Sequence, residues 1–408
     1  MADQTNNSSF FNKFFMTLLA LAPVLMWYDI GMPLGLGPML LLLFSIIPVL
    51  RRRKQNVLPQ TFWIVFVYVC VIWSINNGVE LWTLLPPGGW LFFSFFMVLM
   101  AGVLCFDFDY LKKVIRIVTI TAVVLFWVQY ILLLITGSLH FCFVPRITDH
   151  LLYQDFTYSD IVSRHLQSGH HPCSIFIEKS YMAYYLLTYL SITLFDNIKN
   201  NKWFSKESII IIVTLLLLRS GSGIVGLMVL LAVKAFNLFW NENTGRRILL
   251  LFALGVAAVA TTYIYLGTEA GQEVASRQAE ITTEETSGYA RIMGGYIMFD
   301  QLSIEEQFIG ITMSDATNRF GWIRNDGTYG LYINGVQTIL MTLGYLGLIL
   351  YVIFYGYVFR KVPITYKMCI IILLTIGLLE SNYLNVYMML LTVIPCGMLH
   401  YKQNDILK

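Results

Sequence analysis

Apolar residues along this chain fall into long blocks that are separated by short polar or basic connections. A helix needs about 20 mostly apolar residues to cross the hydrocarbon core of a bilayer. The pattern therefore predicts an all-α polytopic integral membrane protein with about 12 transmembrane helices. These are expected over residues 14–30, 34–50, 61–75, 90–106, 114–136, 180–195, 208–218, 223–240, 248–266, 334–359, 368–379 and 386–401.

Two connections, residues 137–179 and 267–333, are much longer than the rest. Long loops are usually either functional or disordered. Because these two contain aromatic residues, glycines and amphipathic stretches, we expect both to be folded. The predicted organisation is then 1–136 with helices one to five, 137–179, 180–266 with helices six to nine, 267–333, and 334–408 with the last three helices and a tail.

Basic residues predict the orientation of these helices. With the N-terminus inside, 19 of the 27 Lys and Arg residues fall on the inner side, and every short inner connection is basic. Cytoplasmic loops carry such an excess. We therefore expect both termini in the cytoplasm and both long segments on the outer face.

Composition excludes several classes of protein. The chain is 57% hydrophobic and 12% charged, against about 25% charged in a soluble globular domain. A net charge of +3 is too small to indicate nucleic-acid binding. The chain has neither a phosphate-binding Walker loop nor a zinc-protease helix motif.

No metal and no cofactor is predicted. Five of the six histidines lie in segment 137–179, but adjacent histidines such as His170 and His171 usually point apart. Asp107-Phe108-Asp109 matches a common metal-binding tripeptide of nucleotide-sugar transferases, and we interpret it as a solvated loop. Cys142 and Cys173 are both expected outside, where a disulfide is permitted; the sequence leaves open whether they pair.

The outer basic residues are mostly arginine. Seven of the eight are Arg, against seven of 19 on the inner side. The planar guanidinium matches phosphate and carboxylate oxygens two at a time. This bias favours an outer site for an anionic group; chance, together with ion pairing to the outer acids, is the alternative.

Two outer motifs carry candidate arginines. Leu218-Arg219-Ser220-Gly221-Ser222-Gly223 joins two apolar helices, and the second helix would begin beside Arg219, where its N-terminus favours anions. Residues 288–299 have the apolar spacing of a helix, with Gly294 and Gly295 on the face of Arg291. Those glycines would leave room for a headgroup or allow close helix packing.

Several motifs together resemble the bacterial O-antigen polymerase (Wzy) family and, more distantly, the O-antigen ligases. Residues 171–181, His-Pro-Cys-Ser-Ile-Phe-Ile-Glu-Lys-Ser-Tyr, are similar to the family pattern R-P-s-g-x-F-x-E-P-s-x. Leu218-Arg219-Ser220-Gly221 is similar to S-R-[ST]-G, and Gly288 to Gly310 is similar to s-G-R…p-l-f-G-x-G. Asn334-Gly335 followed by Gly344 to Gly347 is similar to H-N…G-x-x-G, with Ile333 where ligases carry His.

The resemblance implies a polymerase of the bacterial inner (plasma) membrane. Its donor and acceptor would be undecaprenyl-diphosphate-linked oligosaccharide repeat units, joined at the periplasmic face with inversion and without a metal; membrane lipid and a chain-length regulator are further expected partners. Arg219 and Arg291 are then assigned to the diphosphate, with Arg164 and Arg319 as weaker candidates. Glu178 is the first candidate for the general base, and His171 the second.

Two rival functions stay open at this point. A transporter or flippase for a lipid-linked oligosaccharide would explain twelve helices, but it explains the two long outer segments and their arginines less well. Ion-coupled transporters usually bury charges within their spans, and few occur here. An O-antigen ligase is the rival within the enzyme class.

Overall fold

The computed structural model describes residues 2–32, 34–51, 58–77, 87–152, 156–167, 171–195, 204–241, 289–323, 329–331, 333–380 and 385–406. These residues divide into two compact units. Unit 1 comprises Met1–Leu227, Ile349–Leu374 and Leu384–Lys408, and unit 2 comprises Met228–Leu348 and Thr375–Tyr383. Each unit is described by itself.

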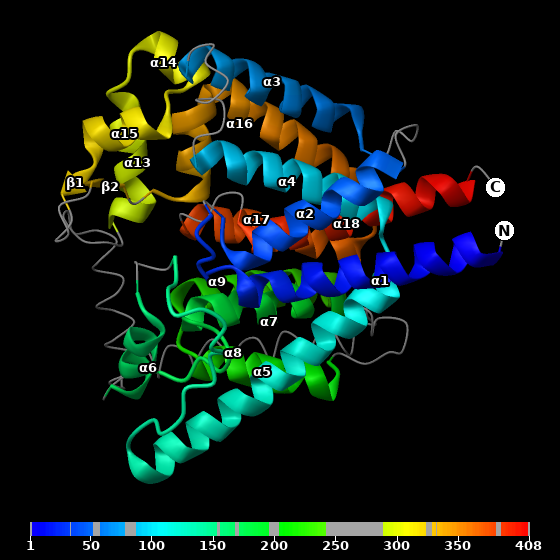
Figure 1. The fold of residues 1–408 in the computed structure, drawn as a ribbon, viewed down its shortest axis with the longest axis vertical. Coiled ribbons are helices and arrows are strands. Elements are labelled where there is room, and N and C mark those ends of the chain that lie inside the picture. Colours follow the sequence, from blue (N-terminus) through cyan, green and yellow to red (C-terminus); the bar gives the residue numbers. More distant parts are fainter. Residues whose placement is uncertain are drawn as a thin grey trace. The chain divides into compact units, whose positions relative to one another are not determined.

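Helices make up nearly all of unit 1 (Figure 1). The prediction of an all-helical fold is confirmed for the described residues, apart from one two-stranded hairpin in unit 2. Every predicted span within these residues coincides with a helix, while 248–266 lies outside them. The helices of unit 1 are α1 (Ala2–Leu25), α2 (Leu36–Arg51), α3 (Gln60–Asn77), α4 (Pro87–Leu104), α5 (Phe108–Thr136), α6 (Tyr158–Leu166), α7 (Lys179–Thr193), α8 (Lys206–Leu217) and α18 (Val386–Ile406); α9 (Gly221–Asn241), α16 (Gly335–Lys361) and α17 (Ile364–Leu379) contribute to both units.

Three described helices are long and apolar enough to cross a membrane: α5, residues Gly221–Trp240 of α9, and α16. Other apolar helices, among them α2, α17 and Val386–His400 of α18, are shorter. These apolar helices indicate that the chain is a membrane protein. The total of twelve spans stays a prediction.

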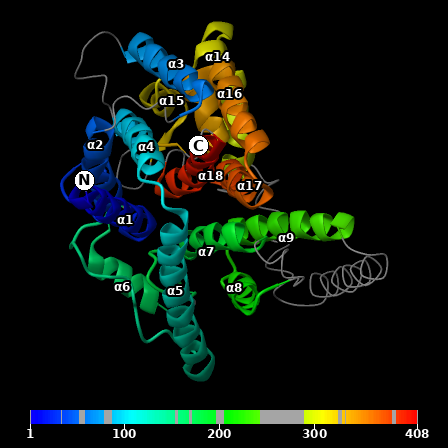
Figure 2. The same ribbon diagram turned by 90° about the vertical axis from the view of Figure 1, so that its right-hand side faces the viewer.

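Pairs of helices in unit 1 pack closely. α1 lies against α2 and α5, and α4 lies between α2 and α18 (Figure 2). Gly37 of α2 lies so close to α1 that a Cβ atom there would be 2.5 Å from the Ala22 carbonyl oxygen. The short link after α1 thus forms a tight helical pair, as the two adjacent apolar blocks predict.

The start of α5 corrects one prediction. Asp107 is not part of a solvated loop: it is the N-cap of α5, and its side chain accepts a hydrogen bond from the Tyr110 backbone N–H at 3.1 Å. An Asp at this position stabilises a helix start because it satisfies an N–H group that lacks an intrahelical partner. Phe108 and Asp109 form the first turn of α5.

The described part of segment 137–179 is anchored to the end of α1. Tyr28 forms a β-bridge with Leu151, and its hydroxyl donates to the Pro145 carbonyl. α6 begins with a capping box in which Thr157 and Asp160 satisfy each other's backbone N–H groups. This anchoring places the segment at the opposite end of α1 from Ala2.

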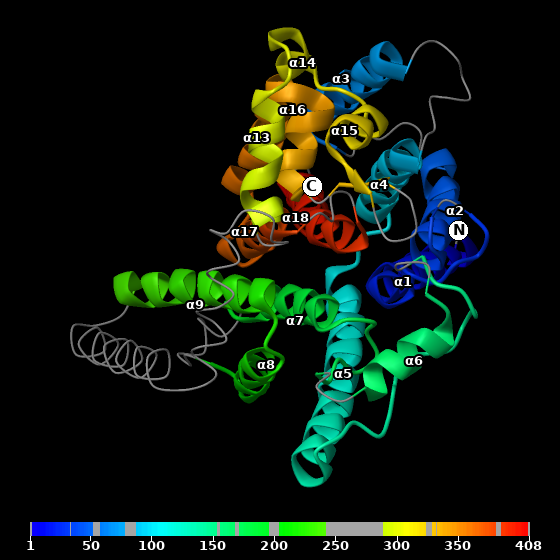
Figure 3. The same cartoon turned by 90° about the vertical axis from the view of Figure 1, so that its left-hand side faces the viewer.

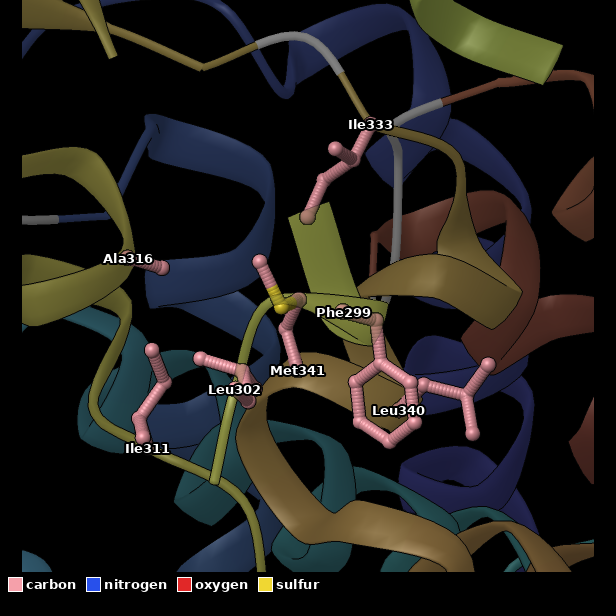
Figure 4. Packing of buried hydrophobic residues seen from close by; sticks show 7 residues of the cluster. All are labelled: Phe299, Leu302, Ile311, Ala316, Ile333, Leu340 and Met341. Atoms are coloured by element: carbon pink, nitrogen blue, oxygen red, sulfur yellow. The ribbon is translucent and has the colours of Figure 1, made fainter. Parts of the chain in front are cut away.

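Unit 2 is built around the first half of α16. The π-helix η2 (Ala290–Gly294) continues into α13 (Gly295–Asp300), and α14 (Ile304–Ile309), α15 (Met313–Phe320) and the hairpin β1–β2 (Trp322–Ile323, Tyr329–Gly330) follow. Figure 3 shows α13 alongside α16. Buried side chains from α13, α15, α16 and the connections between these elements meet in one apolar core (Figure 4), formed by Phe299, Leu302, Ile311, Ala316, Ile333, Leu340 and Met341.

Candidate functional site

Arg219 lies in the turn between α8 and α9, as the sequence predicts. Its φ of 50° is in the left-handed region, which few residues other than glycine adopt. The next residue, Ser220, is buried, and its hydroxyl accepts from the Gly223 N–H at 3.3 Å, in the first turn of α9. Arg219, whose side chain is exposed, thus directly precedes the N-terminal turn of α9, a place where backbone N–H groups favour an anion.

Close packing between α9 and α7 sets the position of this turn. A Cβ atom on Gly223 would be 2.6 Å from the Ala183 Cβ, and Gly226 faces Leu187 in the same way. The Tyr184 and Ser222 hydroxyls share a hydrogen bond of 2.8 Å. Contacts that advance together along both helices mean that the two run parallel. Arg219 precedes Gly223 by four residues. It therefore lies at the end of the α7–α9 pair where α7 begins.

Glu178 directly precedes α7 at this same end. Its side chain makes no capping hydrogen bond to α7. One carboxylate oxygen accepts from the Ser180 hydroxyl at 3.2 Å, and the other lies 3.6 Å from an Arg164 nitrogen. Both charged side chains are partly exposed, 38% for Arg164 and 29% for Glu178. The fold therefore brings Arg164 and Glu178 together, beside the end of α7–α9 that carries Arg219.

His165 holds Arg164 and Glu178 in place. It lies on the buried face of α6 with Ile161, and its Nε2 is 2.9 Å from the Ile177 carbonyl oxygen. A carbonyl only accepts, so Nε2 carries the proton and Nδ1 is an acceptor. His165 directly follows Arg164 in the chain, and its hydrogen-bond partner Ile177 directly precedes Glu178. This hydrogen bond therefore ties the two segments that carry Arg164 and Glu178 to each other. Burial lowers the pKa of His165 and keeps the imidazole neutral.

Cys142 and Cys173 both face this imidazole as free thiols. Their sulfurs lie 3.4 Å and 3.7 Å from Nδ1 of His165, so the structure contains the pair unbonded. Burial raises the pKa of both thiols. Among the described residues no group of His, Cys, Asp and Glu side chains could hold a metal ion. His171, the second candidate base, is half-buried at the start of the stretch that leads to Glu178.

Gln129 was not identified from the sequence, yet it anchors this stretch. It is a buried residue of α5, and its amide donates to the Phe141 carbonyl and accepts from the Ser174 N–H, both at 2.9 Å. Ser174 has a φ of 58° and stands where the family pattern has a glycine. A left-handed residue at this position explains that glycine, because glycine adopts such a backbone without strain.

Arg291 belongs to unit 2, where the backbone of η2 carries it. The Ile292 carbonyl of this turn accepts from the Gln337 side-chain amide at 2.9 Å. Gln337 also forms a reciprocal cap with Asn334 at the start of α16, with bonds of 3.0 Å and 2.9 Å. Both residues are buried, at 0% and 2% exposure. The Asn334 motif thus holds the turn that contains Arg291.

Gly295, after Arg291, serves close packing. A Cβ atom on Gly295 would lie 2.6 Å from the Gln337 side chain. The alternative of open space for a headgroup is therefore wrong at Gly295, because the Gln337 side chain fills that space.

Three other arginines that the sequence analysis places on the outer side have carboxylate partners. Arg319 pairs with Glu306 at 2.8 Å, Arg146 with Asp149 at 2.7 Å, and Arg164 with Glu178 as described. Ion pairing with nearby acids thus accounts for part of the arginine bias. The Ser303 backbone N–H and, after it, the Arg319 guanidinium lower the pKa of Glu306.

Comparison with known proteins agrees with this picture. Residues 88–400 match the model of the WcaD colanic acid polymerase family, which makes the chain a membrane enzyme of the polysaccharide-polymerase class, a glycosyltransferase type. Since the match covers more than half of the chain, this protein belongs to that family. The resemblance to Wzy-type polymerases is confirmed. No curated protein matches the chain.

Proposed function

We propose that this protein polymerises a surface polysaccharide at the periplasmic face of the bacterial inner membrane. It transfers a glycan from undecaprenyl diphosphate to a hydroxyl group of a second lipid-linked repeat unit. The reaction inverts the anomeric centre and uses no metal. Both termini lie in the cytoplasm, and segments 137–179 and 267–333 lie outside. A chain-length regulator is a further expected partner.

One observation carries this proposal most directly. An arginine in a left-handed turn, Arg219, lies at the end of the α7–α9 pair where the Glu178 carboxylate faces Arg164. The site thus combines a cation for a leaving diphosphate with a carboxylate that can take a proton. A polymerase that uses lipid-linked sugars needs these two functions and no nucleotide site.

The proposed step is a direct displacement. The acceptor hydroxyl oxygen forms a bond to the anomeric carbon while its proton passes to Glu178. The bond between that carbon and the diphosphate oxygen breaks, and the lipid diphosphate leaves with the electron pair. Arg219 stabilises the charge that develops on this oxygen. Arg291 is the second residue assigned to the diphosphate. His171 is the second candidate for the base.

Arg164 and Arg319 are weaker candidates for binding the diphosphate. Each guanidinium already faces a carboxylate, Glu178 or Glu306. We assign Arg164 mainly to positioning Glu178, since the ion pair and the His165–Ile177 hydrogen bond act on the same stretch.

The ends of unit 1 support the proposed topology. α1 begins, and α18 ends, at the same end of the unit in Figure 1. The described part of segment 137–179 is bonded to the other end of α1 through Tyr28 and Leu151. The apolar part of α1, Phe10–Leu25, covers about 24 Å along the helix axis, most of a hydrocarbon core of about 30 Å. The termini and this segment therefore suit opposite faces of the membrane.

Replacing Glu178 with glutamine is expected to lower polymer formation about 100- to 10,000-fold, the usual contribution of a general base. Glutamine keeps the shape and an acceptor for Ser180 but cannot take the proton. Surface glycan should then consist of single repeat units, resolved by gel electrophoresis. Glu305→Gln, the same change at an exposed residue of α14, is the matched control. Long chains from normally expressed Glu178→Gln protein would exclude Glu178 as the base; repeat units retained at the inner face would favour a flippase.

A further inference from the structure

Helix α16 is interrupted at Gly344, and the backbone before α15 fills the break. Gly344 has φ 65° and ψ −170°, so the helix is not continuous there. The Phe308–Ile309 backbone passes so close that a Cβ atom on Gly344 would collide with the Phe308 carbonyl. The Ile311 N–H donates to the Met341 carbonyl at 2.7 Å. The regular helical partner of this carbonyl would be the Tyr345 N–H, which lies beyond the break, and the inserted segment supplies an N–H to it.

The length of α16 gives the membrane depth of this break. After the break, residues 345–361 form one helix of about 25 Å, roughly 5 Å less than the hydrocarbon core. Arg360 and Lys361 hold the other end of α16 at the inner boundary. The part of α16 before the break therefore lies near or above the outer boundary of the core. The break at Gly344 lies within about one turn of the outer boundary.

An exposed apolar surface follows this boundary from α16 onto α14. Ile304 and Phe308 are four residues apart on one face of α14, and they are 76% and 50% exposed. The Phe308 ring lies 6.2 Å from the Tyr345 ring, in an edge-on arrangement. Tyr345 and Leu346, the first residues after the break, are 41% and 42% exposed. We call Ile304, Phe308, Tyr345 and Leu346 the α14 ledge.

We propose that the α14 ledge lies in the outer leaflet of the membrane, with Ile304 and Phe308 among the acyl chains just below the headgroups. Lipid is the occupant because the ledge continues the exposed side of a membrane-spanning helix at the depth of the outer boundary. An aromatic residue at this depth, Tyr345, is typical of a membrane interface. The polar partners of α14 fit the same position: Glu306 turns to Arg319 of α15, and Glu305 is exposed.

The membrane position of the α14 ledge also determines how far the turn that carries Arg291 lies above the hydrocarbon core. Gln337, which bonds to the Ile292 carbonyl, precedes Gly344 by seven residues, about 10 Å along the helix. The headgroup region is about 5–8 Å thick on each side of the core. The turn would then lie at the height of lipid phosphates. This last step rests on the proposed function, whereas the membrane position of the ledge does not.

Fluorescence quenching tests the ledge in purified protein. Ile304→Cys, Phe308→Cys and, as control, Asn318→Cys on the exposed side of α15 are labelled with bimane. Each is reconstituted into vesicles of phosphatidylethanolamine and phosphatidylglycerol whose acyl chains are brominated near the headgroup. The unsubstituted protein, labelled in parallel, corrects for the native cysteines. We expect positions 304 and 308 to lose most of their emission and position 318 to lose almost none.

Equal and weak quenching at all three positions would overturn the proposal. The vesicles contain no other protein, so quenching at 304 and 308 identifies lipid and not a protein partner. The readout needs no catalysis, and its outcome is therefore independent of the proposed function. The height of Arg291 has its own test: Ile304→Asp/Phe308→Asp should reduce polymer length while Asn318→Asp does not. Normal polymer length from the double variant would contradict that step alone.

Discussion

Replacing Arg219 with lysine is expected to lower polymer formation about 100- to 1,000-fold, the usual cost of losing one donor to a developing charge. Lysine keeps the positive charge but loses the planar fork that contacts two oxygens of a phosphate at once. Cells with this variant should carry single repeat units in place of long chains. The measurement is the chain-length distribution of surface glycan at matched protein levels.

The left-handed backbone at Arg219 supplies controls for folding. Arg219→Gly and Arg219→Asn place residues that adopt a φ of 50° readily, so both should fold at least as stably as the parent protein while losing the guanidinium. Arg146→Lys, which alters an exposed arginine paired with Asp149, should leave polymerisation unchanged. Long chains from Arg219→Gly, Arg219→Asn and Arg219→Lys would remove Arg219 from the site.

Replacing Gln337 with glutamate is expected to separate the turn of Arg291 from α16. A glutamate at this position can still accept the Asn334 N–H, as in a common capping box. In its carboxylate form it cannot donate to the Ile292 carbonyl, and leaving that carbonyl without its donor costs about 1–3 kcal/mol in a buried setting. A displacement of about 1 Å at a reacting group can reduce rate about 100-fold. We expect short glycan chains from a protein that still inserts and accumulates.

Gln301→Glu is the matched control for this change, since Gln301 is an exposed residue after α13. It adds the same charge to unit 2 without touching the Ile292 carbonyl. Full chain length from Gln337→Glu would show that the hydrogen bond to η2 has no part in catalysis. Equal defects in both variants would point to charge on this surface instead.

Hydrophobic blocks predicted the helices because a membrane span depends mainly on local composition. The turn at Arg219 was predictable for a similar reason, since Arg-Ser-Gly between two apolar blocks defines a tight connection. Asp107 was misinterpreted because a carboxylate before an apolar block serves equally as a loop residue or an N-cap. Only the Tyr110 N–H at 3.1 Å distinguishes the two.

The residues that hold the candidate site residues of each unit in place were not predictable from the sequence. Gln129, His165 and Gln337 act through partners 45, 12 and 45 residues away. No local spacing indicates such contacts. The break in α16 was hidden similarly: Gly344 and Gly347 suggest a motif, but the chain that enters the break comes from residues 308–311.

The most direct test of the polymerase function uses the purified protein in vesicles with synthetic undecaprenyl-diphosphate-linked repeat units and a metal chelator. The function predicts a ladder of glycan chains, with one lipid diphosphate released for each glycosidic bond formed and inverted configuration at each new bond. The Arg219→Lys protein should give almost no ladder. Movement of intact repeat units across the vesicle membrane without any release of lipid diphosphate would contradict the account.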